Sequence, residues 1–110
     1  MLKPVTFPGD SREQLRDFPS TVRGRAGSEL FAVQIGLDPT NWKSIKPIAP
    51  GVREIRIRDE AGAFRVVYLA MLADRVLVLH AFQKKTQETE QTDIDLAAKR
   101  LKDWRAHDGK

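Results

Sequence analysis

Five basic side chains fall on or beside three predicted β-strands, where they could bind a phosphate group together. Arg56 and Arg58 alternate with isoleucines, so both project from the same face of one strand. Arg65 begins the next strand, and Lys84 and Lys85 lie at the end of the third. Because short turns join these strands, the five side chains can converge on one side of an antiparallel sheet. Arginine suits such a site, since its planar guanidinium binds phosphate through two hydrogen bonds.

Other residue types offer less chemistry. His80 lies in the third strand, and its ordinary pKa of about 6.5 suits proton transfer. A histidine at the end of an apolar strand can equally be packed and locally hydrogen-bonded. Asp93 and Asp95 are two residues apart in a predicted helix and point to opposite sides, which makes them a poor metal-binding pair. With no cysteine, no Gly-rich phosphate loop and no histidine metal-ligand spacing, we expect no metal and no cofactor.

The composition favours a small globular protein with an anionic partner. The 110 residues are 41% hydrophobic and 31% charged, which predicts one folded domain over residues 1–110. The net charge of +4 favours a nucleic acid or an acidic protein as partner, although arginines on a polar strand face can also be merely solvated. No apolar run approaches the ~18 residues of a membrane span, and the N-terminus has no apolar signal core. We therefore expect a cytoplasmic protein that does not contact a membrane.

The N-terminal half predicts one strand and two helices. Residues 3–7 read as a short edge strand between two prolines. One helix begins at Asp10 or Ser11, and a second is capped by Ser20 and ends at Gly36. The second helix carries apolar residues at helical spacing, namely Val22, Ala26, Leu30, Val33 and Leu37. The two helices are expected to form a hairpin with their arginines facing water.

The C-terminal half predicts a sheet and a last helix. Residues 38–51 contain three prolines and predict a connecting loop, which Trp42 and Ile45 pin to the core. Three strands of an antiparallel meander follow, over residues 52–58, 64–72 and 76–83. The last helix begins near Thr89 or Thr92. The predicted order is therefore β-α-α-β-β-β-α.

Four segments, in this order, resemble the RelE/ParE toxin superfamily. They are Val52-Arg-Glu-Ile-Arg-Ile-Arg58, Phe64-Arg-Val-Val-Tyr68, Leu79-His-Ala-Phe-Gln-Lys-Lys-Thr86 and Asp93-Ile-Asp-Leu-Ala97. The third segment, followed by an amphipathic helix, is the most specific and resembles the phage-derived, HigB-like branch. The resemblance implies an α+β fold in which a helical hairpin packs on a twisted antiparallel sheet, with a C-terminal helix.

The resemblance also implies a function. It points to the toxin of a type II toxin–antitoxin system, a metal-independent endoribonuclease that cuts mRNA on the ribosome and so inhibits translation. It implies a cognate antitoxin, which in this branch usually carries a helix-turn-helix domain. Two alternatives stay open. ParE-type members of the superfamily block DNA gyrase and cut nothing, and a catalytically silent module would keep only its antitoxin contact.

RNA cleavage by such a fold uses the ribose 2′-hydroxyl as nucleophile, so the site must move protons and neutralise a phosphate. The resemblance implies basic catalytic residues at Arg56, Arg65 and Lys85, with His80 as a further candidate. It predicts RNA binding by Arg53, Arg58 and Lys84. At the start of its strand, beside the turn, the head of Arg65 is expected to reach solvent or a phosphate.

The proton transfer has no obvious carrier. Several ribonucleases of the superfamily use a tyrosine after the last strand, but the single tyrosine here, Tyr68, lies in the second strand of the meander and is expected in the core. Four substitutes remain, namely Lys84, Lys85, Arg56 and His80. A lysine could act only if neighbouring cations lowered its pKa.

Overall fold

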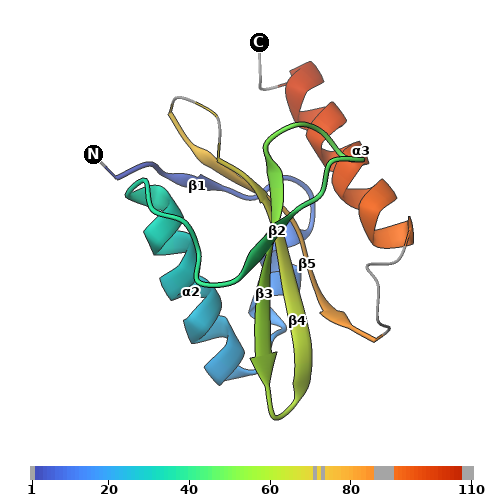
Figure 1. Cartoon of the computed structure of the whole chain (residues 1–110). Helices are drawn as coiled ribbons and strands as arrows, with labels where there is room; N and C mark the ends of the chain where they lie inside the picture. Colours follow the sequence, from blue (N-terminus) through green and yellow to red (C-terminus); the bar gives the residue numbers. More distant parts are fainter. Residues whose placement is uncertain (1, 71, 73, 86–90, 108–110) are drawn as a thin grey trace.

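A five-stranded sheet lies between helices in the computed structural model, which describes residues 2–70, 72, 74–85 and 91–107 (Figure 1). The elements are β1 (Val5–Thr6), α1 (Ser11–Arg16), α2 (Ser20–Gln34), β2 (Trp42–Ser44), β3 (Val52–Asp59), β4 (Gly62–Leu69), β5 (Val76–Lys84) and α3 (Gln91–His107). The strand order is β1-β5-β4-β3-β2, with β1 parallel to β5 and the other neighbours antiparallel. The predicted α+β class, helical hairpin and three-stranded meander are confirmed.

Each face of the sheet has its own helical cover. The apolar side of α2 packs with Phe18 against residues such as Ile55 and Ile57 of β3. On the opposite face, α3 buries Ala97, Leu101 and Trp104 against apolar residues of β4 and β5. Figure 1 shows α2 and α3 on opposite sides of the central strands. Alternate residues of β3 and β4 therefore belong to different layers, as the pleat of a strand requires.

The helix ends differ in part from the sequence expectation. Asp10 precedes α1, but its side chain makes no capping hydrogen bond. Ser20 is the first helical residue of α2 rather than its cap, because Pro19 takes the cap position with a φ of −52°. Thr92 likewise lies inside α3, and Thr89 is outside the described residues. Residues with a polar side chain next to a helix start are thus good markers of the boundary but not of the cap itself.

The C-terminal end of α2 follows the prediction more closely. Gly36 has a φ of +89°, a left-handed conformation that glycine adopts without a steric penalty. The Leu37 N–H then donates to the Ala32 carbonyl at 2.8 Å, which closes the last turn. Leu37 itself is 60% exposed, so its predicted place on the apolar side of the helix is wrong. The reversal at Gly36 has already taken the chain off the helix axis.

The predicted loop at residues 38–51 contains a strand. β2 pairs with β3, which places Trp42 opposite Ile55 and Lys43 opposite Glu54. Ile45 is buried and Trp42 half-buried, as expected for residues that pin this segment. A strand of three residues between prolines is too short to show an alternating pattern, so it could not be predicted from periodicity. Its consequence is that Lys43 lies beside the meander.

A cationic face of the sheet as candidate functional site

The register of the sheet gathers four of the predicted basic residues on one face. Arg56 of β3 lies directly opposite Arg65 of β4. Ala63 of β4 lies opposite both Arg58 of β3 and Lys84 of β5. Residues directly opposite each other share a face. Because Ala63 is small, its side chain leaves a shallow depression between Arg58 and Lys84. The predicted convergence of basic side chains is therefore seen for these four residues.

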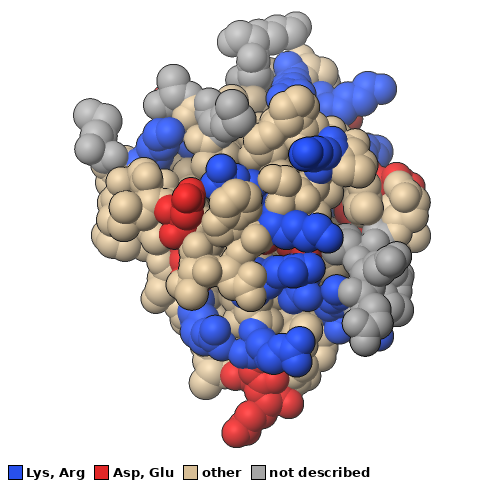
Figure 2. Space-filling model, in the orientation of Figure 1, with Lys and Arg blue, Asp and Glu red and all other residues tan. Residues whose placement is uncertain are grey.

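β2 extends this row by a residue that sequence reasoning missed. Lys43 pairs with Glu54, so its side chain is on the same face as those of Arg56 and Arg58. We call the group Lys43, Arg56, Arg58, Arg65 and Lys84 the cationic face. Figure 2 shows Lys and Arg side chains gathered across the middle and lower part of the molecule, with few acidic ones among them. The alternation of Trp42 and Lys43 was the available signal, and it is two residues long.

A buried ion pair lies within the cationic face. Glu54 is 1% exposed, and its Oε1 is 3.3 Å from Nε of Arg65 and 3.7 Å from Nε of Arg56. Arg65 is itself only 7% exposed, and its Nη1 donates to the Phe64 carbonyl at 3.1 Å. The expectation that the Arg65 head reaches solvent is thus wrong, because Glu54 and the backbone hold the guanidinium against the sheet. The charge of Arg65 is poorly screened in this low-dielectric setting, although its guanidinium is not accessible.

The remaining cations are more accessible. The Arg56 side chain is 34% exposed, Arg58 and Lys43 are exposed, and Lys84 is intermediate. Burial, together with the charges of Arg65 and Arg56, lowers the pKa of Lys84. Burial also lowers the pKa of Arg65, but a guanidinium stays protonated in practice. Lys84 is consequently a lysine of this face whose surroundings favour loss of its proton.

Two predicted site residues lie elsewhere. Arg53 pairs with Tyr68 on the opposite face of β3, where it bonds Asp38 at 2.8 Å and stacks 3.9 Å from the Trp42 ring. Arg53 therefore does not lie on the same face as Arg58 and Lys84, the other predicted RNA-binding residues. Lys85 follows the last residue of β5 and is exposed. The buried position of Tyr68 confirms it as a core residue, and burial raises its pKa.

His80 ties three elements together beneath α3. It is 3% exposed, with Nδ1 2.9 Å from Oε1 of Gln14 in α1 and Nε2 2.7 Å from Oδ1 of Asp93 in α3. Arg100 also donates to Gln14 Oε1, at 2.8 Å. Burial lowers the pKa of His80, against the raising effect of Asp93. Because both ring nitrogens already have protein partners, this geometry favours a structural role over proton transfer to a substrate.

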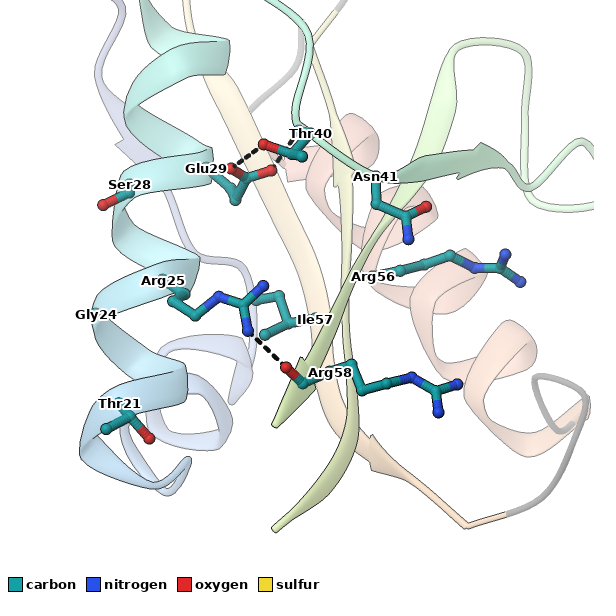
Figure 3. A pocket seen from close by; sticks show the side chains of 10 residues that line it. All are labelled: Thr21, Gly24, Arg25, Ser28, Glu29, Thr40, Asn41, Arg56, Ile57 and Arg58. Carbon is teal, nitrogen blue, oxygen red and sulfur yellow. Dashed lines mark hydrogen bonds between the residues drawn. The ribbon is translucent and has the colours of Figure 1, made fainter. Parts of the chain in front are cut away.

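A groove of about 530 Å³ lies between α2 and β3 (Figure 3). Arg25 crosses it and donates from Nη1 to the Arg58 carbonyl at 2.5 Å. Figure 3 shows the side chains of Arg56 and Arg58 pointing away from α2, so these residues border the groove mainly through their backbone. The groove and the cationic face share β3 but open on different sides of it. Among the described residues, no group of three or more His, Asp or Glu side chains could hold a metal ion.

Comparison with solved structures defines the class of fold. A double arginine-to-alanine variant of the E. coli toxin RelE in the free state superposes with a TM-score of 0.65 at 17% identity, covering 94% of this chain and 98% of that chain. The fold is thus RelE-like, as the sequence resemblance predicted. The family model described as "Phage derived protein Gp49-like (DUF891)" matches residues 13–102, and the chain belongs to this family. A search of curated proteins gave no significant match. No helix among the described residues is long and apolar enough to cross a membrane.

Proposed function

We propose that this protein is the toxin of a type II toxin–antitoxin system, of the HigB-like branch, and that it cleaves mRNA on the ribosome. The observation that carries the proposal is the cationic face, in which accessible Arg56, Arg58 and Lys84 surround the buried Glu54–Arg65 pair on a RelE-like sheet. Such a surface suits a polyanion, and fixed cations stabilise charge that develops on a phosphate.

The proposed chemistry assigns a role to each of these positions. The 2′-hydroxyl of a ribose attacks the adjacent phosphorus, the bond to the 5′-oxygen breaks, and a 2′,3′-cyclic phosphate forms. Arg56 and Arg58 bind the phosphate oxygens, and Arg65 adds positive charge from below. Lys84 in its neutral form takes the proton of the 2′-hydroxyl, which its lowered pKa favours. Lys85, at the end of the same strand, is the remaining basic candidate to protonate the leaving oxygen.

An apolar surface on α2 supports a protein partner. Phe31 and Ile35 are one helical turn apart and exposed, and Leu37 and Leu2 are exposed nearby. Leu2 comes close because the Lys3 N–H donates to the Gln34 carbonyl at 3.2 Å. Exposed apolar side chains in a group mark interaction sites, so this surface suits the proposed helix-turn-helix antitoxin. The toxin and antitoxin would act in the cytoplasm.

Brief expression without the antitoxin tests the proposed function. We expect incorporation of labelled amino acid to stop within minutes while thymidine incorporation continues, because mRNA is cut during translation. Primer extension should then map new 5′ ends within open reading frames. The matched control is Arg56→Ala, expressed to the same level. Arrest of DNA synthesis before protein synthesis would favour a gyrase poison instead, and normal growth would favour a silent module.

A further inference from the structure

We infer that Glu54 is a positioning residue of the cationic face, whose buried carboxylate holds the guanidinium groups of Arg65 and Arg56 and limits the positive charge around Lys84. This inference rests on the proposed function in treating the face as the site of RNA cleavage. Neither the family description nor the likeness to RelE assigns a role to an acidic residue here.

The buried position of the Glu54 carboxylate costs desolvation free energy, so its presence needs an explanation. It lies on β3 between Arg53 and Ile55, with Val67 opposite it on β4. A carboxylate that is 1% exposed has lost its water and needs compensating partners. For stability alone, an apolar residue of similar size would serve as well as a buried ion pair or better. The site therefore gains something from this charge other than stability.

One gain is the orientation of two arginines. A single oxygen, Glu54 Oε1, faces the Nε atoms of both Arg65 and Arg56, at 3.3 and 3.7 Å. Arg65 also donates from Nη1 to the Phe64 carbonyl, so its guanidinium has one ion pair and one hydrogen bond. Nε of Arg56 makes an ion pair with Glu54 but no hydrogen bond, and a third of the side chain stays exposed. Two guanidinium groups held before a ligand arrives lose less rotamer freedom when it binds.

The second gain is electrostatic balance at Lys84. Four cations share the face of the sheet with this lysine, namely Lys43 of β2, Arg56 and Arg58 of β3, and Arg65 of β4. Glu54 acts in the opposite direction and favours the protonated lysine. On α3, the helix that covers this side of the sheet, the Asp93 carboxylate is bonded to His80. Without Glu54 the cations act unopposed, so the pKa of Lys84 must fall further.

The test compares Glu54→Gln with wild type by two measurements. The first is the titration of Lys84, followed by NMR of its ε-carbon and assigned with Lys84→Arg. The second is the pH profile of single-turnover cleavage of mRNA bound to ribosomes. We expect Lys84 to titrate at lower pH in Glu54→Gln, the acidic limb of the profile to move to lower pH by the same amount, and the maximal rate to fall about 10- to 100-fold, as for other residues that orient a functional group.

Controls separate this role from a purely structural one. Glu29→Gln removes a carboxylate that bonds Thr40 in the groove beside α2, and it should leave both measurements unchanged. Glu54→Asp keeps the charge and should restore part of the rate and of the Lys84 titration. If Glu54→Gln does not fold, Glu54→Asp alone still tests the inference. Its shorter side chain moves the carboxylate away from the arginines, so the pKa of Lys84 must again be lower than in wild type.

The outcomes are distinguishable. An unchanged or higher pKa for Lys84 in a folded Glu54 variant overturns the inference, whether or not RNA is cut. If wild type cuts no mRNA, the proposed function fails, but the lysine titration still measures the effect of Glu54. A lower rate with an unmoved pH profile would reduce Glu54 to a stabilising residue and overturn the positioning role.

Discussion

Arginines of this protein differ in what holds them, and that difference decides what each can do. Arg53 is bound on both sides, by Asp38 and by the Trp42 ring, and belongs to the layer of α2. Arg65 is buried against Glu54 and the backbone. Arg56 has one distant anchor and remains accessible. Arg56 can therefore reorient toward a ligand at little cost in free energy, whereas Arg65 can interact with a ligand only from its present position.

Arg56→Ala should separate activity from stability. The side chain is a third exposed, and Glu54 keeps Arg65 as its partner, so we expect the free energy of unfolding to change by less than about 1 kcal/mol. Loss of a cation that contacts the transition state should slow cleavage about 100-fold. Urea unfolding and single-turnover cleavage measure the two effects. A stable variant with wild-type cleavage would remove Arg56 from the site.

Arg65→Ala should destabilise the protein strongly, unlike the replacement of an exposed residue. It leaves Glu54 buried with only the more distant Arg56, and breaking a buried pair costs about 3 kcal/mol. Toxicity should then fall by more than the amount of folded protein does, because the variant loses both stability and a positive charge at the proposed site. Arg65→Lys should recover little, because one ammonium cannot reach both Glu54 and the Phe64 carbonyl. Arg58→Ala is the matched surface control, and equal stability of the two alanine variants would contradict this assignment.

Strand alternation predicted part of this arrangement. Arg56 and Arg58 were expected on one face, and the same alternation places Arg53 on the other face, as the structure has it. The burial of Arg65 could not be predicted in this way. It depends on Glu54 and on the packing of β2 and α3 against the sheet. These are tertiary contacts between distant segments, which a local sequence pattern does not reveal.

At the scale of elements, the two ends of the meander are held by different means. β2 adds a short ladder to β3 and positions Lys43. At the other side, His80 connects β5 to Gln14 of α1 and Asp93 of α3. The long, strongly patterned elements were predictable from their periodicity. β2 was not, since three residues carry no period, and neither was the His80 contact, which joins segments 66 residues apart along the chain.

The His80 contact predicts how stability depends on pH. Because burial lowers the pKa of His80, the unfolded chain binds a proton more readily than the folded chain. The free energy of unfolding should therefore fall as the pH drops below the unfolded pKa of about 6.5, and stay level above it. Melting temperatures at pH 5 and pH 7.5 measure this, with His80→Gln as the comparison. The variant should lose most of the difference, and a wild type more stable at pH 5 would contradict the assignment.

The whole molecule carries a net charge of +4, and four of its accessible cations share one side of the sheet. Lys43, Arg56, Arg58 and Lys84 span four adjacent strands from β2 to β5. A surface of this kind binds a flexible polyanion through counterion release, so its affinity must depend on salt concentration.

Salt dependence can count these contacts. Four neutralised phosphates of a single strand give a slope of about −3 in log affinity against log salt, or roughly 50-fold weaker binding between 50 and 200 mM salt. The probe is a 2′-deoxy oligonucleotide, which cannot be cleaved by attack of a 2′-hydroxyl. Lys84→Gln should make the slope shallower by about 0.7. Lys99→Gln, which removes a lysine paired with Asp103 on α3, should not change it.

Because β1 pairs with β5, the sheet cannot be complete until β5 has been synthesised. Val5 pairs with Val76, and the Val76 N–H donates to the Pro4 carbonyl at 2.9 Å. Contacts so distant in sequence form late, while the β3–β4 hairpin can form locally. Lys84 and the α3 helix that covers β5 emerge later still. A chain that ends before β5 therefore carries Arg56, Arg58 and Arg65 without the strand that supplies Lys84.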